Sequence, residues 1–136
     1  MSTARVPAVL LVWLNDGVVE RELVGGKGAS LSRLTELGAR VPPAFALTTH
    51  AYELFAERLG LPRRASDVAD ADLPDLRARI ESAALPDEVR QLVAREFNIC
   101  QELAGGECAL AVRSSATAED SAEFSFAGLH DTILDV

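Results

Sequence analysis

Cysteines are few in this chain of 136 residues, and basic side chains are outnumbered by acidic ones. Cys100 and Cys108 form no CxxC spacing and have no paired histidine motif, which argues against a zinc site or a disulfide framework and favours buried, reduced thiols. The 13 Lys and Arg residues are set against 21 Asp and Glu residues, so the formal net charge is −8. This balance argues against a nucleic-acid partner, which would need a basic face, but a small phosphorylated ligand needs only a few cations in one place.

Long hydrophobic runs are also missing. The apolar run Ala8–Leu14 stops at Asn15-Asp16-Gly17, and no strongly basic segment precedes it, so we expect neither a membrane span nor a signal peptide. We therefore expect a cytoplasmic protein without membrane partners. With 49% hydrophobic and 25% charged residues the composition is typical of globular proteins, and no repeat or linker divides the chain. Residues 1–136 are predicted to form one lobe around one core.

The first third of the chain is predicted to contain a hairpin and a short helix. Residues 8–14 and 18–19 flank Asp16-Gly17, which supplies the positive backbone dihedrals of a tight turn, so we expect them to pair as two strands. A helix is expected from near Lys27 to Gly38, because leucines recur at helical spacing between them. These leucines are Leu31, Leu34 and Leu37.

Residues 41–47 should be extended, since residues before proline avoid the helical region, and Thr48 or Thr49 can cap a following helix. The side chains expected to face inward from that helix are Tyr52, Phe55 and Leu59. Residues 61–72 are polar and are predicted to form a loop.

Two further helices and two strands complete the prediction. One helix should cover residues 74–84, and the other should begin at Pro86-Asp87-Glu88, a favourable first turn, and end at Gly105-Gly106. The second helix should bury an apolar stripe made of Val89, Leu92, Val93, Phe97, Cys100 and Leu103. Residues 109–115 should form a strand, and Thr132 should begin another that ends at Val136 without a polar tail, as if the chain were cut there. The mixture of elements predicts an α+β fold.

Lys27 stands in an unusual place. It lies in the first turn of its predicted helix and on the same helix face as the leucine stripe. A cation at a helix N-terminus is unfavourable by about 0.3–1 kcal/mol unless an anion or acid compensates, and a phosphate would do so. The segment Gly25–Gly28 is not a Walker A loop, because Arg21 stands where that motif needs glycine and Gly28 where it needs Ser or Thr. The simpler alternative is a glycine-permitted turn whose lysine points to solvent.

Arg113 leaves an otherwise apolar strand that we expect to be buried, with Leu110 and Val112 on the opposite strand face. Such a guanidinium needs a partner, and its planar fork of donors suits a carboxylate or a phosphate. An internal ion pair with one of the acidic residues is therefore the competing interpretation. The hydroxyls that follow could donate to a phosphate or could simply close a turn.

Three segments together resemble the N-terminal nucleotide-binding domain of the phosphoenolpyruvate synthase and pyruvate phosphate dikinase family, which also includes rifampin phosphotransferase. They are Gly25–Gly28, Leu110–Asp120 and Ser125–Leu134, and the resemblance extends from about Leu23 to Val136. It implies the first lobe of an ATP-grasp-like nucleotide-binding domain, with the second lobe absent from the chain. Lys27 and Arg113 match the family's phosphate-binding lysine and arginine, and the resemblance implies that they act as electrostatic clamps in catalysis. It also implies that Gly26 and Ser114, next to them in sequence, bind ATP.

Residues 127–132 match the family's loop over the ATP phosphates, where glycine permits close backbone approach and amides donate to oxygens. The expected contacts here are Gly128, Leu129, Asp131 and Thr132. The commoner family pattern has Gln-Gln or Met-Met where Leu129-His130 stands, so the role of His130 stays open, and we assign it no phosphocarrier function.

The resemblance implies a nucleotide-binding part of a phosphoenolpyruvate synthase that helps to move the β-phosphate of ATP to a carrier histidine on another domain. The implied partners are ATP and the downstream phosphohistidine and substrate domains. Mg²⁺ is implied as well, with its ligands outside this chain, and Glu119 and Asp120 are not assigned to it. Alone, the chain is expected to be catalytically silent. The alternatives are part of a rifampin phosphotransferase-like kinase, and a non-catalytic nucleotide-binding or protein-binding module.

Overall fold

The computed structural model describes residues 9–62, 65–117 and 132–134. They contain both helices and short strands, in agreement with the predicted α+β class. In chain order the elements are β1 (Leu11–Trp13), α1 (Arg21–Glu36), β2 (Phe45–Leu47), α2 (Thr49–Leu59), the 3₁₀ turns η1 (Ala65–Asp67) and η2 (Asp70–Asp72), α3 (Leu73–Ser82), α4 (Asp87–Leu103), β3 (Val112–Arg113) and β4 (Thr132–Ile133). None of the described helices is long and apolar enough to cross a membrane.

The partner of β1 is β2, so the predicted hairpin between residues 8–14 and 18–19 is wrong. β1 and β2 pair antiparallel, with Val12 opposite Ala46 and Trp13 opposite Phe45. Gly17 adopts a φ of 147°, as the turn prediction required. The chain after it leads into α1, and the Val19 N–H donates to Ser32 Oγ at 2.9 Å and not to a strand. Two valines are too short a run to compete with β2 as a ladder partner.

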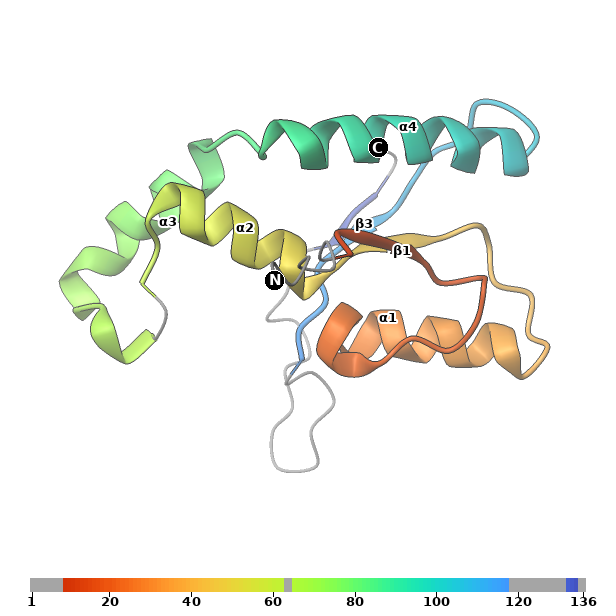
Figure 1. Ribbon diagram of the computed structural model, residues 1–136, viewed down its shortest axis with the longest axis horizontal. Helices are drawn as coiled ribbons and strands as arrows, with labels where there is room; N and C mark the ends of the chain where they lie inside the picture. Colours follow the sequence, from red (N-terminus) through yellow and green to blue (C-terminus); the bar gives the residue numbers. More distant parts are fainter. Residues whose placement is uncertain (1–8, 63–64, 118–131, 135–136) are drawn as a thin grey trace, which may run out of the picture.

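The β1–β2 ribbon lies between two helices. Figure 1 shows α4 along one side of β1 and α1 along the other. Trp13 connects the ribbon to α4, because its indole Nε1 donates to Glu96 Oε2 at 2.9 Å. Within the ribbon, the Trp13 ring packs against that of Phe45, with centroids 5.4 Å apart. The buried apolar side chains come from each of these layers and from α2: Leu14, Val24, Ala51, Val89 and Cys100.

α4 confirms the most regular of the predicted helices. Asp87 and Glu88 occupy its first turn, where carboxylates favourably meet the positive end of the helix dipole. Val89 is 1% exposed and Cys100 is buried, while Leu92, Val93 and Phe97 are half-buried. The prediction is wrong for Leu103, which is 64% exposed in the last turn of the helix.

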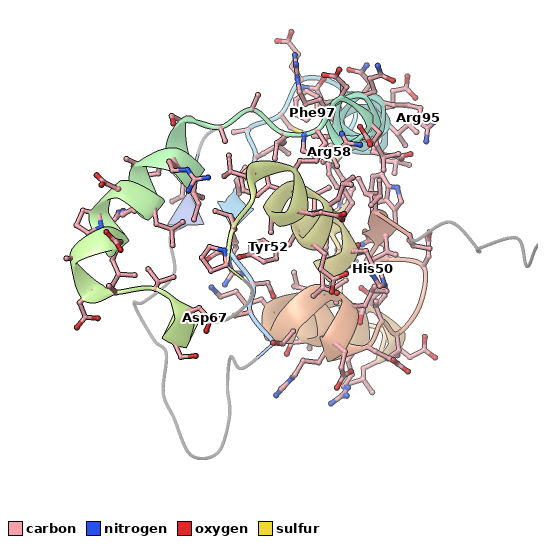
Figure 2. All side chains as sticks on the ribbon, turned by 60° about the vertical axis from the view of Figure 1, so that its left-hand side comes forward. His50, Tyr52, Arg58, Asp67, Arg95 and Phe97 are labelled. Carbon is pink, nitrogen blue, oxygen red and sulfur yellow. The ribbon has the colours of Figure 1, made fainter. Side chains whose placement is uncertain are left out.

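α2 begins as expected, with Thr48 as its N-cap, since the Thr48 side chain accepts from the Ala51 N–H. Phe55 and Leu59 are half-buried, but Tyr52 is 62% exposed and does not face inward as predicted (Figure 2). Residues 61–72 hold the two short 3₁₀ turns in place of a plain loop, and α3 starts one residue before the predicted helix.

The predicted strand at residues 109–115 is reduced to β3. Its two residues pair antiparallel with β4, Val112 opposite Ile133 and Arg113 opposite Thr132. The strand predicted for residues 132–136 does begin at Thr132, but β4 ends at Ile133, and residues 135–136 lie outside the described part of the chain. This small ladder fixes the backbone of Thr132 next to that of Arg113, two residues singled out from the sequence as phosphate contacts.

Candidate functional site

The candidate site begins with a break in α1. The helix starts at Arg21, earlier than predicted, but Gly25 inside it has φ 76° and ψ 178°, a conformation essentially restricted to glycine. The helical path therefore resumes at Gly26, and Lys27 stands in the first turn of the resumed segment, as the sequence indicated. Its leucine stripe is not a buried face, however, because Leu34 and Leu37 are 46% and 76% exposed. The buried residues of α1 are Val24, Gly25, Gly26, Gly28 and Ser32.

Residues 25–28 and residues 114–116 lie against each other. The Gly26 N–H donates to the Ala116 carbonyl at 2.9 Å, and the Gly28 N–H donates to Ser115 Oγ at 3.4 Å. Figure 1 shows the chain that follows β3 passing the start of α1. The structure therefore brings together the two motifs that the sequence singled out at opposite ends of the chain.

Lys27 takes part in the same contact. Its Nζ donates to the Ser114 carbonyl at 3.1 Å, across 87 positions of sequence, and the residue is half-buried. The lysine is not merely a solvent-pointing side chain, because it is held on the backbone directly after Arg113. The carbonyl oxygen supplies part of the negative partner that a cation at a helix start requires.

Arg113 departs from its predicted setting, since both residues of β3 are exposed. The expectation of a guanidinium leaving a buried strand is therefore wrong. Within the described part of the chain the Arg113 side chain forms no hydrogen bond or ion pair, so the internal ion pair considered from the sequence is not formed there. A two-residue strand with one described neighbour, β4, offers too little cover to bury it.

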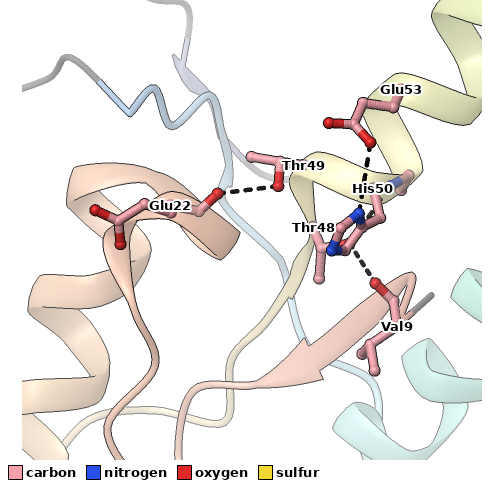
Figure 3. A network of polar contacts seen from close by, with 7 residues as sticks. Val9, Glu22, Thr48, Thr49, His50 and Glu53 are labelled. Carbon is pink, nitrogen blue, oxygen red and sulfur yellow. Dashed lines mark hydrogen bonds and ion pairs between the residues drawn. The ribbon is translucent and has the colours of Figure 1, made fainter. Parts of the chain in front are cut away.

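The start of α1 is also held from its other side. Thr49 Oγ1, at the N-terminus of α2, donates to the Glu22 carbonyl at 2.9 Å, and Thr48 Oγ1 donates to the Val9 carbonyl at 2.6 Å (Figure 3). Figure 3 places these two bonds side by side, so that Thr48 and Thr49 link the chain just before β1 to the first turn of α1. The part of α1 that precedes the break at Gly25 is thereby held in place.

Ser115 is the residue of this site that the sequence reasoning underrated. A Cβ atom placed on Gly25 would overlap Ser115 Oγ and would lie 2.8 Å from the Ala116 nitrogen. The signal that could have identified this contact is the glycine pair itself, because adjacent glycines permit a close approach of another backbone.

The remaining predicted contacts, Gly128, Leu129 and Asp131, lie outside the described residues, as does His130. No cluster of three or more potential metal ligands occurs among the residues that the structure describes. An open groove of about 430 Å³ lies between β1 and α4, away from segments 25–28 and 113–116. Its lining residues are Trp13, Asn15, Asp16, Val41, Pro43, Glu96, Ile99 and Leu103.

Comparison with known proteins gives sequence matches that cover both contacting segments. The sequence model of the pyruvate phosphate dikinase AMP/ATP-binding domain matches residues 21–136, which include both contacting segments. The chain is 37% identical to a probable phosphoenolpyruvate synthase of Methanocaldococcus jannaschii over 93% of its own length and 12% of that protein. It is 38% identical to the phosphoenolpyruvate synthase of Neisseria meningitidis, over 93% of the chain and 18% of that enzyme.

A third relative has a different named activity. The prodigiosin synthesizing transferase PigC of Serratia marcescens is 39% identical over 96% of the chain and 14% of its own length. The chain thus spans less than a fifth of the length of each of these three relatives.

Proposed function

This chain belongs to the family of the pyruvate phosphate dikinase AMP/ATP-binding domain, and we propose that it forms the first lobe of an ATP-grasp-like site in a cytoplasmic, phosphoenolpyruvate synthase-like enzyme. ATP lies between this lobe and a second lobe outside the chain. The β-phosphate of ATP is transferred to a carrier histidine on another domain, with AMP as the leaving group and the γ-phosphate released to water as inorganic phosphate. The histidine then passes the phosphoryl group to the acceptor. Mg²⁺, held by ligands outside these residues, supplies further positive charge at the phosphates.

The contact between Lys27 Nζ and the Ser114 carbonyl is the observation that carries this proposal. Catalysis of phosphoryl transfer is mainly positioning and charge stabilisation, so the cations must be gathered at one place. Lys27 and Arg113 are 86 positions apart in sequence, yet the Lys27 ammonium contacts the residue next to Arg113. The two side chains act as electrostatic clamps on the phosphates, not as acid or base.

Further contacts to ATP come from the neighbouring residues. Ser114 follows Arg113 directly, and the Thr132 backbone is paired with that of Arg113 in the β3–β4 ladder. Gly128, Leu129 and Asp131 belong to the segment that leads into Thr132, so we assign them to the same phosphates. Gly26 contributes to the same site by holding residues 114–116, through the hydrogen bond from its N–H to the Ala116 carbonyl.

Pyruvate is the acceptor we favour, because phosphoenolpyruvate synthases recur among the relatives. The similarity to PigC at comparable identity shows that relatives of this segment also occur in proteins named for another reaction. Acceptor choice therefore rests with other domains, and a kinase for another acceptor, such as a rifampin phosphotransferase-like enzyme, is the alternative.

The test is ATP-dependent phosphoenzyme formation in a longer protein that carries this segment and a downstream histidine domain. Replacing Arg113 by Ala should lower the rate of phosphohistidine formation by about 100-fold or more, because a cation that stabilises developing charge is lost. Arg40→Ala is the matched control, since Arg40 is also an exposed arginine but lies outside the site. The isolated 136-residue chain should form no phosphoenzyme. Full activity of the Arg113 variant would contradict the proposal.

A further inference from the structure

The N–H groups at the start of a helix have no partners within the helix and are often left to bind phosphate. At the start of the resumed part of α1, two of these groups are already engaged. The Gly26 N–H donates to the Ala116 carbonyl and the Gly28 N–H to Ser115 Oγ. Ser115 thus accepts a hydrogen bond from an N–H of the first helical turn, as an N-cap serine does in its own helix, although Ser115 is 87 positions from Gly28 in sequence.

The glycines explain why this distant segment can approach so closely. Both Gly25 and Gly26 are buried. A Cβ on Gly25 would overlap Ser115 Oγ and would come within 2.8–2.9 Å of the backbone of residues 115 and 116, which cannot move aside as a flexible side chain could. The absence of a side chain at Gly25 therefore makes room for the segment that follows Arg113.

We propose that residues 25–28 form a seat for residues 114–116, with Ser115 as the positioning residue, and that phosphate oxygens are met there by the side chains of Lys27 and Arg113 and not by the Gly26 and Gly28 amides. The phosphate part of this inference rests on the proposed function. The seat sets the spacing between the two cations, because Lys27 belongs to one of its halves and Arg113 directly precedes the other.

Hydrogen exchange of the Gly26 and Gly28 amides in the 136-residue chain tests the seat without any nucleotide. Both amides should exchange slowly in the absence of ATP, and Ser115→Ala should accelerate exchange at Gly28 by about 3- to 10-fold, the range that the loss of one hydrogen bond gives. Ser30→Ala, at an exposed serine of the same helix, should leave exchange at Gly28 unchanged. Amides that exchange freely until ATP is added would overturn the seat and indicate a phosphate loop.

Titration of the same variants with ATP, in a longer protein that also carries the second lobe and far below their melting temperatures, separates positioning from stability. Ser115→Ala should weaken ATP binding by about 3- to 10-fold although the chain stays folded, because the cations lose their fixed spacing. An unchanged dissociation constant would overturn the positioning role. Slow amides at Gly26 and Gly28 in a longer wild-type protein that carries both lobes but binds no ATP would support the seat and overturn the proposed function.

Replacing Gly25 by Ala tests the close approach itself. The added methyl group should displace residues 114–116, so that ATP binding falls more than in Ser115→Ala and exchange at Gly26 becomes fast. Gly60→Ala is the control, because Gly60 also has a positive φ, 69°, but has nothing within 4 Å of an added Cβ. Combining Gly25→Ala with Ser115→Ala should give less than the sum of the two effects, since they act on one contact. Additive effects, or equal losses in the Gly25 and Gly60 variants, would contradict the seat.

Discussion

Lys27 donates from Nζ to the backbone carbonyl of Ser114 over 3.1 Å, and this bond joins the start of α1 to the residue that follows β3. Lys27 is also the only lysine in the sequence, in which the other twelve basic residues are arginines. An ammonium group is a compact point charge, whereas a guanidinium is a broad planar fork. A half-buried position beside a carbonyl therefore suits lysine.

The core position of Val89 can be tested by truncation. Val89→Ala should lower the free energy of unfolding by about 2–3 kcal/mol, because two methyl groups leave a site that is 1% exposed and a cavity remains. Val18→Ala is the control, since Val18 is 57% exposed and should change stability little. Urea denaturation measures both values. Equal midpoints for the two variants would place Val89 outside the core.

The ion pair between α2 and α4 should make stability depend on pH. Arg58 Nη1 donates to Glu88 Oε2 at 2.8 Å (Figure 2 shows Arg58 reaching toward α4), and this bond, with the backbone hydrogen bond of Glu88, lowers the pKa of the Glu88 carboxyl. A carboxyl whose pKa is lower in the folded state stabilises the fold above its unfolded pKa, and the contribution disappears as pH falls through the folded pKa.

Glu88→Gln should therefore be less stable than wild type at neutral pH. The difference should shrink as the pH falls below the usual Glu value of about 4.3, and should also shrink in high salt. Thermal unfolding between pH 7 and 2 measures it, with Glu36→Gln as an exposed control that forms no ion pair among the described residues. A difference that grows with acidity would have the wrong sign for this explanation.

The two thiols should react at different rates. Cys100 is 4% exposed, its Sγ donates to the Pro43 carbonyl at 3.6 Å, and burial raises the pKa of its thiol. Cys108 is half-exposed. A thiol reagent should modify Cys108 in a fast phase and Cys100 only as the fold opens, and both at one rate in denaturant. The Cys100→Ala variant should lose the slow phase of modification. If it loses the fast phase instead, the fast-reacting thiol is Cys100 and this assignment is wrong.

Local patterns in the sequence were enough to predict α4 and the start of α2. The stripe that includes Val89 and Cys100, the acidic first turn and the terminal glycines all lie within one helix, and Thr48 caps a helix that begins at the next residue. Such signals depend on neighbours in sequence. Exposure at the edges of these helices, as at Tyr52 and Leu103, depends on what else packs there and was not predicted correctly.

Contacts between distant segments account for most of the other differences. The partner of β1 is a strand more than thirty positions away, and a plausible turn at Asp16-Gly17 suggested a nearer one. For the candidate site, the sequence indicated Lys27 and Arg113, but the exposure of Arg113 and the role of Ser115 follow from how residues 25–28 and 114–116 meet. Periodicity within one segment carries no information about such a meeting.

Protection of Lys27 from an amine-specific reagent tests most directly whether its ammonium binds the phosphates of ATP. Because Lys27 is the only lysine of residues 1–136, the labelled peptide that carries it reports this side chain alone, also in a longer protein that supplies the second lobe of the ATP site. ATP should slow the labelling of Lys27, adenosine should not, and Arg113→Ala should remove most of the protection by ATP. Labelling that is unaffected by ATP, or slowed equally by adenosine, would contradict a shared phosphate site at Lys27 and Arg113.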